Sequence, residues 1–209
     1  MGRIHLVDIV ADFFGSDIKS SEDYRKIFSD IKTTSYDDNG KTPLINSKER
    51  CLDFDKIKTV YFKEHGKRHK DLNKLKYSDY PYTKMNEFCS NDAVAIFEEM
   101  DYFIEFKNKP DLDNKKDRIT EKIKDSVLIY LDILDEKLSY TRDNLGYILV
   151  YNPSKSDKEI DKINAIIKRY GQKEIDKFGL RANYEDFYFK RVRIMPKEDF
   201  EIFLKNKDK

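Results

Sequence analysis

The stretch that decides the fold is DAVAIFEEMDYFIEFKN, residues 92–108. It contains two apolar and aromatic runs, 92–97 and 102–108, joined by the link 98–101, and this pattern predicts a β-hairpin. In such a hairpin we expect residues 92–95 to lie opposite residues 104–107. Asp92 then stands near the C-terminal end of the second strand.

The charged side chains of the second strand share one face. Side chains alternate along a strand, so Glu105 and Lys107 are neighbours and the residues between them point the other way. Burial of this pair is unfavourable unless the two charges pair with each other or with a ligand. The hairpin brings Asp92 near them, so that two carboxylates and one ammonium converge. Carboxylates bind hard divalent ions such as magnesium, and a neighbouring ammonium can hold an attacking water, as phosphodiester hydrolysis requires.

The alternative for Glu105 and Lys107 is a cross-strand ion pair on a solvated face of the sheet. The flanking runs are apolar on both faces, which indicates a covered sheet. A cleft that uses the charges is therefore favoured over a solvated face.

Further elements are expected on both sides of the hairpin. Apolar residues recur every three or four positions over 115–138, which predicts a long helix, and the apolar run 145–152 predicts a strand covered on both sides. Helical spacing also marks 21–32 and 156–170, while 186–195 alternates as an edge strand and Pro196 opens a last helix. This order predicts an α/β fold with a central mixed sheet flanked by helices.

The length of 209 residues fits one domain. We expect a core at 45–152 that carries the hairpin, an N-terminal helical element at 1–44, and a C-terminal helix-strand-helix extension at 153–209.

The order of Asp92, a hairpin, Glu105-x-Lys107, a long helix and a buried strand resembles the PD-(D/E)XK nuclease superfamily over about residues 45–152. The resemblance implies a restriction-endonuclease-like core of the order α-β-β-β-α-β. It also implies a metal-dependent nuclease in which Asp92 and Glu105 bind Mg²⁺ or Mn²⁺ and Lys107 positions the nucleophilic water. DNA is favoured over RNA as the substrate by the same analogy. The chain departs from the pattern at Asn91, which stands where the superfamily has its proline.

Members of that superfamily often add a glutamate on an upstream helix and a polar residue on the helix after the E-x-K strand. Glu49 is the best upstream acid, with Glu64 and Glu87 as competitors. Lys122 and Ser126, four residues apart on the long helix, could face the site together. The alternative for Lys122 is a surface lysine whose stem packs on the helix.

A basic cluster, HGKRHK, lies at 65–70. It makes His65, Lys67, Arg68, His69 and Lys70 the candidates for nucleic-acid contacts, and a solvated helix face or loop is the alternative. The two histidines could share one helix face and bind a metal if a helix continues through Gly66, but a glycine argues against a rigid helix there.

Composition limits the classes that remain. The 41 lysines and arginines against 40 acids give a net charge of +1, which excludes a polyanion binder that acts through overall charge. Two cysteines and three histidines do not predict a structural zinc site. Two free thiols, with no membrane span or signal peptide predicted, lead us to expect a cytoplasmic protein. The alternative to a nuclease is a catalytically inactive nuclease-fold protein, such as an immunity or regulatory factor, that binds a protein or nucleic acid.

Overall fold

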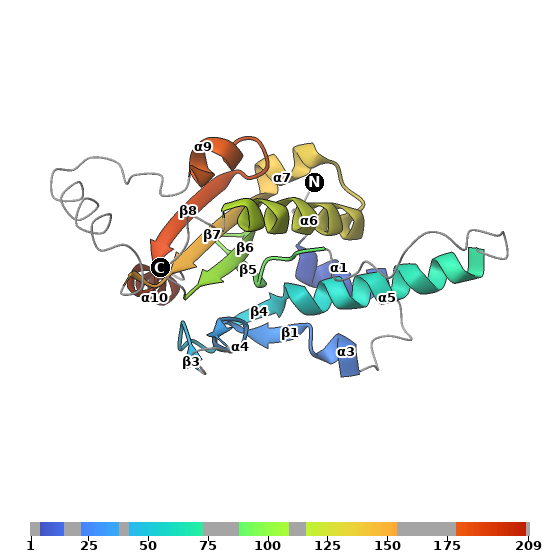
Figure 1. Ribbon diagram of the computed structural model, residues 1–209, viewed down its shortest axis with the longest axis horizontal. Helices are drawn as coiled ribbons and strands as arrows, with labels where there is room; N and C mark the ends of the chain where they lie inside the picture. The colour runs from blue at the N-terminus through green and yellow to red at the C-terminus, as the bar shows by residue number, and fades with distance from the viewer. Residues whose placement is uncertain are drawn as a thin grey trace.

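The structure is a computed structural model that describes residues 5–14, 22–37, 42–72, 88–108, 116–153 and 179–207. These residues form a six-stranded mixed sheet in the order β1-β4-β5-β6-β7-β8, flanked by helices (Figure 1). The predicted α/β class with a central mixed sheet is confirmed. The strands of this sheet are β1 (Phe28–Asp30), β4 (Arg50–Asp53), β5 (Ala93–Phe97), β6 (Met100–Lys107), β7 (Leu145–Tyr151) and β8 (Arg191–Pro196).

Helices cover both faces of the sheet. One face packs against α1 (Leu6–Phe14), α5 (Phe54–Leu72), α6 (Lys116–Leu134) and α9 (Leu180–Tyr184). The opposite face packs against α4 (Ile31–Thr34) and α10 (Lys197–Asn206). Because both faces are covered, β7 is buried along its whole length, as the continuous apolar run predicted.

The β5–β6 hairpin is tighter than expected. Glu98 and Glu99 alone form the turn, with φ angles of 50° and 57°, a left-handed conformation that hairpin turns usually give to asparagine or glycine. The shorter turn pairs Ala93 with Ile104 and Ala95 with Tyr102. The predicted register, with 92–95 opposite 104–107, was therefore wrong by two residues, and Asp92 lies beside Glu105.

The N-terminal region is not a purely helical element. The predicted helix 21–32 is divided into α3 (Glu22–Arg25), β1 and α4, because Phe28–Asp30 pairs with Arg50–Leu52 in the main sheet. Residues Tyr36–Asp37 (β2) and Thr42–Pro43 (β3) form a separate two-stranded sheet. Strand pairing across the chain outweighed the local helical spacing.

The C-terminal half follows the predicted order with shifted bounds. Helix α6 ends at Leu134, Asp135 takes a left-handed φ of 53°, and a second helix, α7 (Leu138–Asn144), precedes β7. The predicted edge strand is confirmed as β8, although it begins at Arg191 instead of 186, and α10 follows Pro196 as expected. The predicted helix at 156–170 lies outside the described residues.

Gly146 allows a close approach between β6 and β7. A Cβ atom at this position would lie 2.3 Å from a carbon of the Tyr102 ring, so the ring fits across the strand only above a glycine. The guanidinium of Arg193 lies 5.7 Å from the centre of the same ring.

No helix among the described residues is long and apolar enough to cross a membrane.

Candidate functional site

The candidate site lies where β5 begins and β6 ends. The backbone N–H of Asp92 donates to the carbonyl of Ile104 at 3.1 Å, and its carbonyl accepts from the N–H of Phe54 at 3.2 Å. The N–H of Phe106 donates to Asp92 Oδ2 at 2.7 Å, which fixes the carboxylate toward β6. Backbone contacts on both sides thus hold Asp92 next to Glu105 on the face covered by α6.

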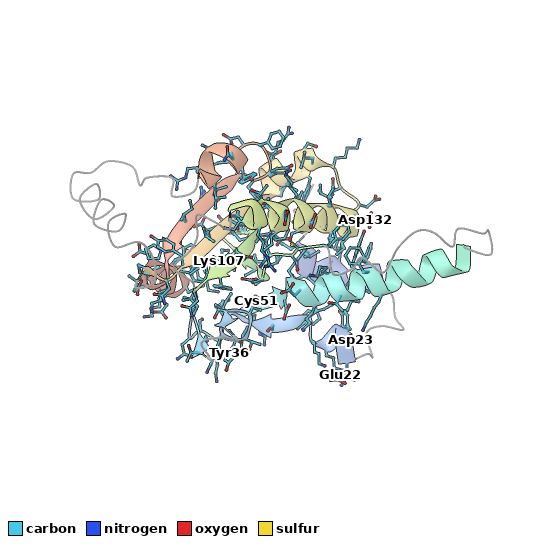
Figure 2. The ribbon with its side chains drawn as sticks, in the orientation of Figure 1. Glu22, Asp23, Tyr36, Cys51, Lys107 and Asp132 are labelled. Atoms are coloured by element: carbon cyan, nitrogen blue, oxygen red, sulfur yellow. The ribbon has the colours of Figure 1, made fainter. Side chains whose placement is uncertain are left out.

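Lys122 of α6 joins the two carboxylates. Its Nζ donates to Asp92 Oδ1 at 2.9 Å and to Glu105 Oε1 and Oε2 at 2.8 and 2.9 Å. Lys107 forms an ion pair with Glu105 Oε1 from the same strand; Figure 2 labels Lys107 at this end of the sheet. Two carboxyl groups and two ammonium groups therefore form one compact cluster, which has no net charge when all four groups are ionised.

Burial determines the electrostatics of the cluster. The Glu105 side chain is fully buried, whereas 19% of the Asp92 side chain is exposed. Burial and the neighbouring Glu105 carboxylate raise the pKa of Asp92 to about 7, against the opposing effect of Lys122, Lys107 and the Phe106 N–H. Burial alone lowers the pKa of Lys122, but the carboxylates of Glu105 and Asp92 outweigh it and raise that pKa above its ordinary value. Lys122 thus stays charged while Asp92 titrates near neutrality.

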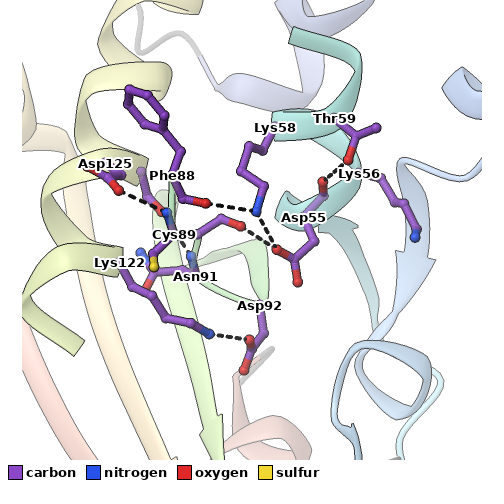
Figure 3. A network of polar contacts seen from close by, with 12 residues as sticks. Asp55, Lys56, Lys58, Thr59, Phe88, Cys89, Asn91, Asp92, Lys122 and Asp125 are labelled. Atoms are coloured by element: carbon purple, nitrogen blue, oxygen red, sulfur yellow. Dashed lines mark hydrogen bonds and ion pairs between the residues drawn. The ribbon is translucent and has the colours of Figure 1, made fainter. Parts of the chain in front are cut away.

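The segment before Asp92 is clamped between α5 and α6 (Figure 3). From α5, Lys58 Nζ donates to the Phe88 carbonyl at 3.2 Å, and Asp55 accepts from the Ser90 hydroxyl. From α6, Asp125 Oδ2 accepts the Cys89 N–H at 2.9 Å. The two helices therefore set where the chain enters β5.

Ser126 serves this clamp and not the carboxylates. Its buried Oγ accepts the backbone N–H of Asn91 at 2.9 Å. It lies one turn from Lys122 on α6, as predicted, but its hydroxyl acts on the residue before Asp92.

Two buried polar groups near the cluster have no hydrogen-bond partner among the described residues. They are the side-chain amide of Asn91, which precedes Asp92, and the hydroxyl of Tyr147 on β7. Burial and the carboxylates of Glu105 and Asp92 raise the pKa of Tyr147 well above its ordinary value, so the phenol stays protonated. Unsatisfied buried polar groups are rare in folded proteins and mark this region as unusual.

The structure does not bring Glu49 to the site. Glu49 precedes β4 at the opposite end of the strands, and its Oε1 pairs with Lys207 Nζ at 2.5 Å. The antiparallel pairing of β4 with β5 brings the other end of β4 to this region, where Asp53 pairs with Ala93.

The predicted basic cluster lies on α5. This helix continues through Gly66 to Leu72, so the expected break at the glycine was wrong. The side chains of His65, Lys67, Arg68, His69 and Lys70 lie outside the described part of the chain. Among the described residues, no three histidines, cysteines or acids gather in a way that could hold a metal ion.

The clamp residues Asp55, Lys58 and Asp125 were missed by the sequence reasoning. Each contacts a residue at least 30 positions away, at separations of 35, 30 and 36 residues. No local pattern signals such contacts.

Comparisons with family models, curated proteins and solved structures found no match to this chain.

Proposed function

We propose that this site hydrolyses phosphodiester bonds of nucleic acid with the help of a divalent metal ion, with DNA favoured over RNA. The observation that carries the proposal is the convergence of Asp92, Glu105, Lys107 and Lys122 at one end of the sheet. Buried charges need partners, and a cluster of this kind at the end of strands is a typical place for catalysis. The resemblance to PD-(D/E)XK nucleases supports the same reading.

The donor set suits a hard divalent ion. Asp92 Oδ1 and both oxygens of Glu105 lie 2.8–2.9 Å from a single atom, the Nζ of Lys122, so they already converge on one cation position. Magnesium and manganese prefer such carboxylate oxygens. A bound ion would polarise a phosphoryl oxygen and lower the pKa of a water molecule. Asp92 and Glu105 would hold it, and the ammonium of Lys122 would have to leave the position between them.

The two lysines then have separate tasks. Lys107 sits two residues from Glu105 and is 15% exposed, so its ammonium can hold an attacking water and stabilise negative charge on the phosphate. Lys122, once displaced, remains at the rim of the site on α6 and can contact a phosphate oxygen.

A second candidate function rests on the neutrality of the cluster. The two ammonium groups balance the two carboxylates without any ligand, which is also what a structural ion cluster requires. In that case the chain is a nuclease-fold protein without catalysis that binds a protein or nucleic-acid partner.

Cleavage assays distinguish the two functions. Purified protein is incubated with plasmid DNA, single-stranded DNA and RNA in the presence of Mg²⁺, Mn²⁺ or a chelator, and the Glu105→Gln variant serves as the control for contaminating nucleases. We expect metal-dependent cleavage by the wild type only. If Glu105→Gln cleaves as fast as the wild type, or if the wild type cleaves no substrate, the nuclease function is rejected in favour of the binding function.

A further inference from the structure

A cleft rich in cations opens beside the edge strand β1. It has a volume of about 730 Å³ and is bounded by α3, β1, α4, β4 and the first turn of α5. We call it the basic cleft, because five of its lining side chains are cationic and three are acidic, an excess of two positive charges. The cations are Arg25, Lys26, Lys48, Arg50 and Lys56.

The acids of the basic cleft are already engaged. Asp30 Oδ1 accepts the Thr33 N–H at 2.7 Å and caps α4, and Asp53 Oδ1 accepts the Lys56 N–H at 3.0 Å. Glu22 pairs with Lys26 at 2.7 Å. The carboxylates thus serve the local structure.

Three cations remain for a ligand. Lys48, Arg50 and Lys56 are exposed and form no ion pair with another residue that the structure describes. Figure 3 shows Lys56 pointing away from Asp55 and the clamp. Three cations without an ion pair to any described residue form, in a cleft, an electrostatic site for phosphate groups.

An apolar pocket adjoins the basic cleft. It has a volume of about 520 Å³ and opens where β4 and β5 stop pairing, since only Leu52–Val94 and Asp53–Ala93 are paired. Phe28, Ser29 and Arg50 line both hollows. Glu22 and Cys51, labelled in Figure 2, line the cleft and the pocket respectively.

Phe28 stands between the two hollows with 47% of its surface exposed. Its ring contacts Tyr24 edge-on at 5.4 Å between centres, which holds it in place. An exposed aromatic ring beside a row of cations is the usual platform for an unpaired base, because bases stack on the ring while phosphates follow the cations. Paired bases are stacked inside a duplex and cannot reach such a ring.

The basic cleft borders the segment that carries the candidate site. Asp53, one of its lining residues, pairs with Ala93, and the next residue, Phe54, donates its N–H to the carbonyl of Asp92. The cleft and Asp92 are therefore joined through neighbouring backbone.

We propose that the basic cleft and the adjoining apolar pocket bind a single-stranded segment of nucleic acid, with phosphates on Lys48, Arg50 and Lys56 and a base on Phe28. This inference rests on the proposed function and adds the strandedness of the substrate and the surface that binds it.

The test measures binding separately from cleavage. Fluorescence anisotropy is recorded in chelator with labelled single-stranded DNA, single-stranded RNA and duplex DNA of the same sequence. The cleft variant replaces Lys48, Arg50 and Lys56 by Ser. The matched control replaces Lys137, Lys190 and Lys205 by Ser, three exposed lysines elsewhere that carry the same total charge.

We expect the wild type to bind single strands more tightly than duplex. The cleft variant should lose at least about tenfold in affinity and about 2 in the slope of log affinity against log salt, since each single-strand phosphate contact contributes roughly 0.7. Phe28→Leu should lose about fivefold with an unchanged slope, and Phe28→Tyr should keep its affinity. Thermal unfolding verifies that each variant is folded.

Several outcomes would overturn the inference: equal affinity of the cleft variant and the matched control, duplex binding as tight as single-strand binding, or no binding by the wild type. Because no metal is present, these outcomes are independent of catalysis. If the protein binds nucleic acid through the cleft but cleaves none, the proposed nuclease function is wrong and the proposed binding cleft stands. If the cleft variant cleaves as fast as the wild type, the proposed role of the cleft is wrong and the nuclease function stands. A preference between single-stranded DNA and RNA identifies which of the two the cleft serves.

Discussion

Lys122 on α6 and Glu105 on β6 form a bidentate ion pair, with Nζ 2.8 and 2.9 Å from the two carboxylate oxygens, across 17 residues of sequence. Glu105 is fully buried, and the same ammonium also reaches Asp92. The lysine therefore occupies the position that a divalent cation would take between the carboxylates.

Replacement of Lys122 by Met should destabilise the metal-free protein and strengthen metal binding. Removal of one partner of a buried ion pair costs roughly 3 kcal/mol or more, because the remaining charge is left without compensation. Mn²⁺ should then raise the melting temperature of the variant more than that of the wild type. Thermal unfolding with and without Mn²⁺ measures both effects, with Lys137→Met as the exposed control. Equal Mn²⁺ stabilisation of all three proteins would contradict competition between lysine and metal.

Replacement of Glu105 by Gln should lower cleavage by about a hundredfold or more, because the amide removes a charged ligand while it preserves the shape of the side chain. Cleavage rates and circular dichroism are compared with those of Glu136→Gln, an exposed glutamate. Retention of most of the wild-type rate by a folded Glu105→Gln protein would remove Glu105 from the site.

Replacement of Lys107 by Ala should lower the cleavage rate by about a hundredfold, the range that follows the loss of one electrostatic stabiliser. Metal affinity should survive, since both carboxylates remain. Single-turnover kinetics and calorimetry with Mn²⁺ separate the two quantities. If the variant lost metal binding and kept its turnover, the role assigned to Lys107 would be wrong.

Asp92 should make stability depend on pH in a defined window. Its pKa is raised from about 4 in the unfolded chain to about 7 in the folded one, so the folded state binds the extra proton between these values. The contribution of Asp92 to stability is thus full below about pH 4 and is lost as pH rises to about 7. Relative to Asp92→Asn, the wild type should lose roughly 2–4 kcal/mol across this window. Urea denaturation in chelator at several pH values measures the difference, and a constant difference would refute the raised pKa.

Replacement of Gly146 by Ala should destabilise the fold by roughly 1–3 kcal/mol, because the new methyl group overlaps the Tyr102 ring and forces it to move. The double variant with Tyr102→Leu should cost less than the sum of the two single changes, since the smaller side chain leaves room. Denaturant unfolding of the four proteins gives the coupling. Strict additivity would show that the ring is not the obstacle.

The sequence by itself determined the elements with strong local periodicity. The alternation in β6, the three-to-four spacing of α6 and the continuous apolar run of β7 each depend on neighbours within a few residues, so they can be read directly. The same alternation was enough to put Glu105 and Lys107 on one face with an acid close by.

Only the tertiary structure decided the rest. A left-handed turn at Glu98 and Glu99 has no residue signal, since neither is glycine or asparagine, and it moved the register by two. Pairing with β4 turned Phe28–Asp30 into a strand against its helical spacing. Lys122 met both carboxylates because α6 packs over the ends of β5 and β6, and the clamp joins residues 30 or more positions apart. Such contacts depend on how whole elements pack, and local patterns carry no information about that packing.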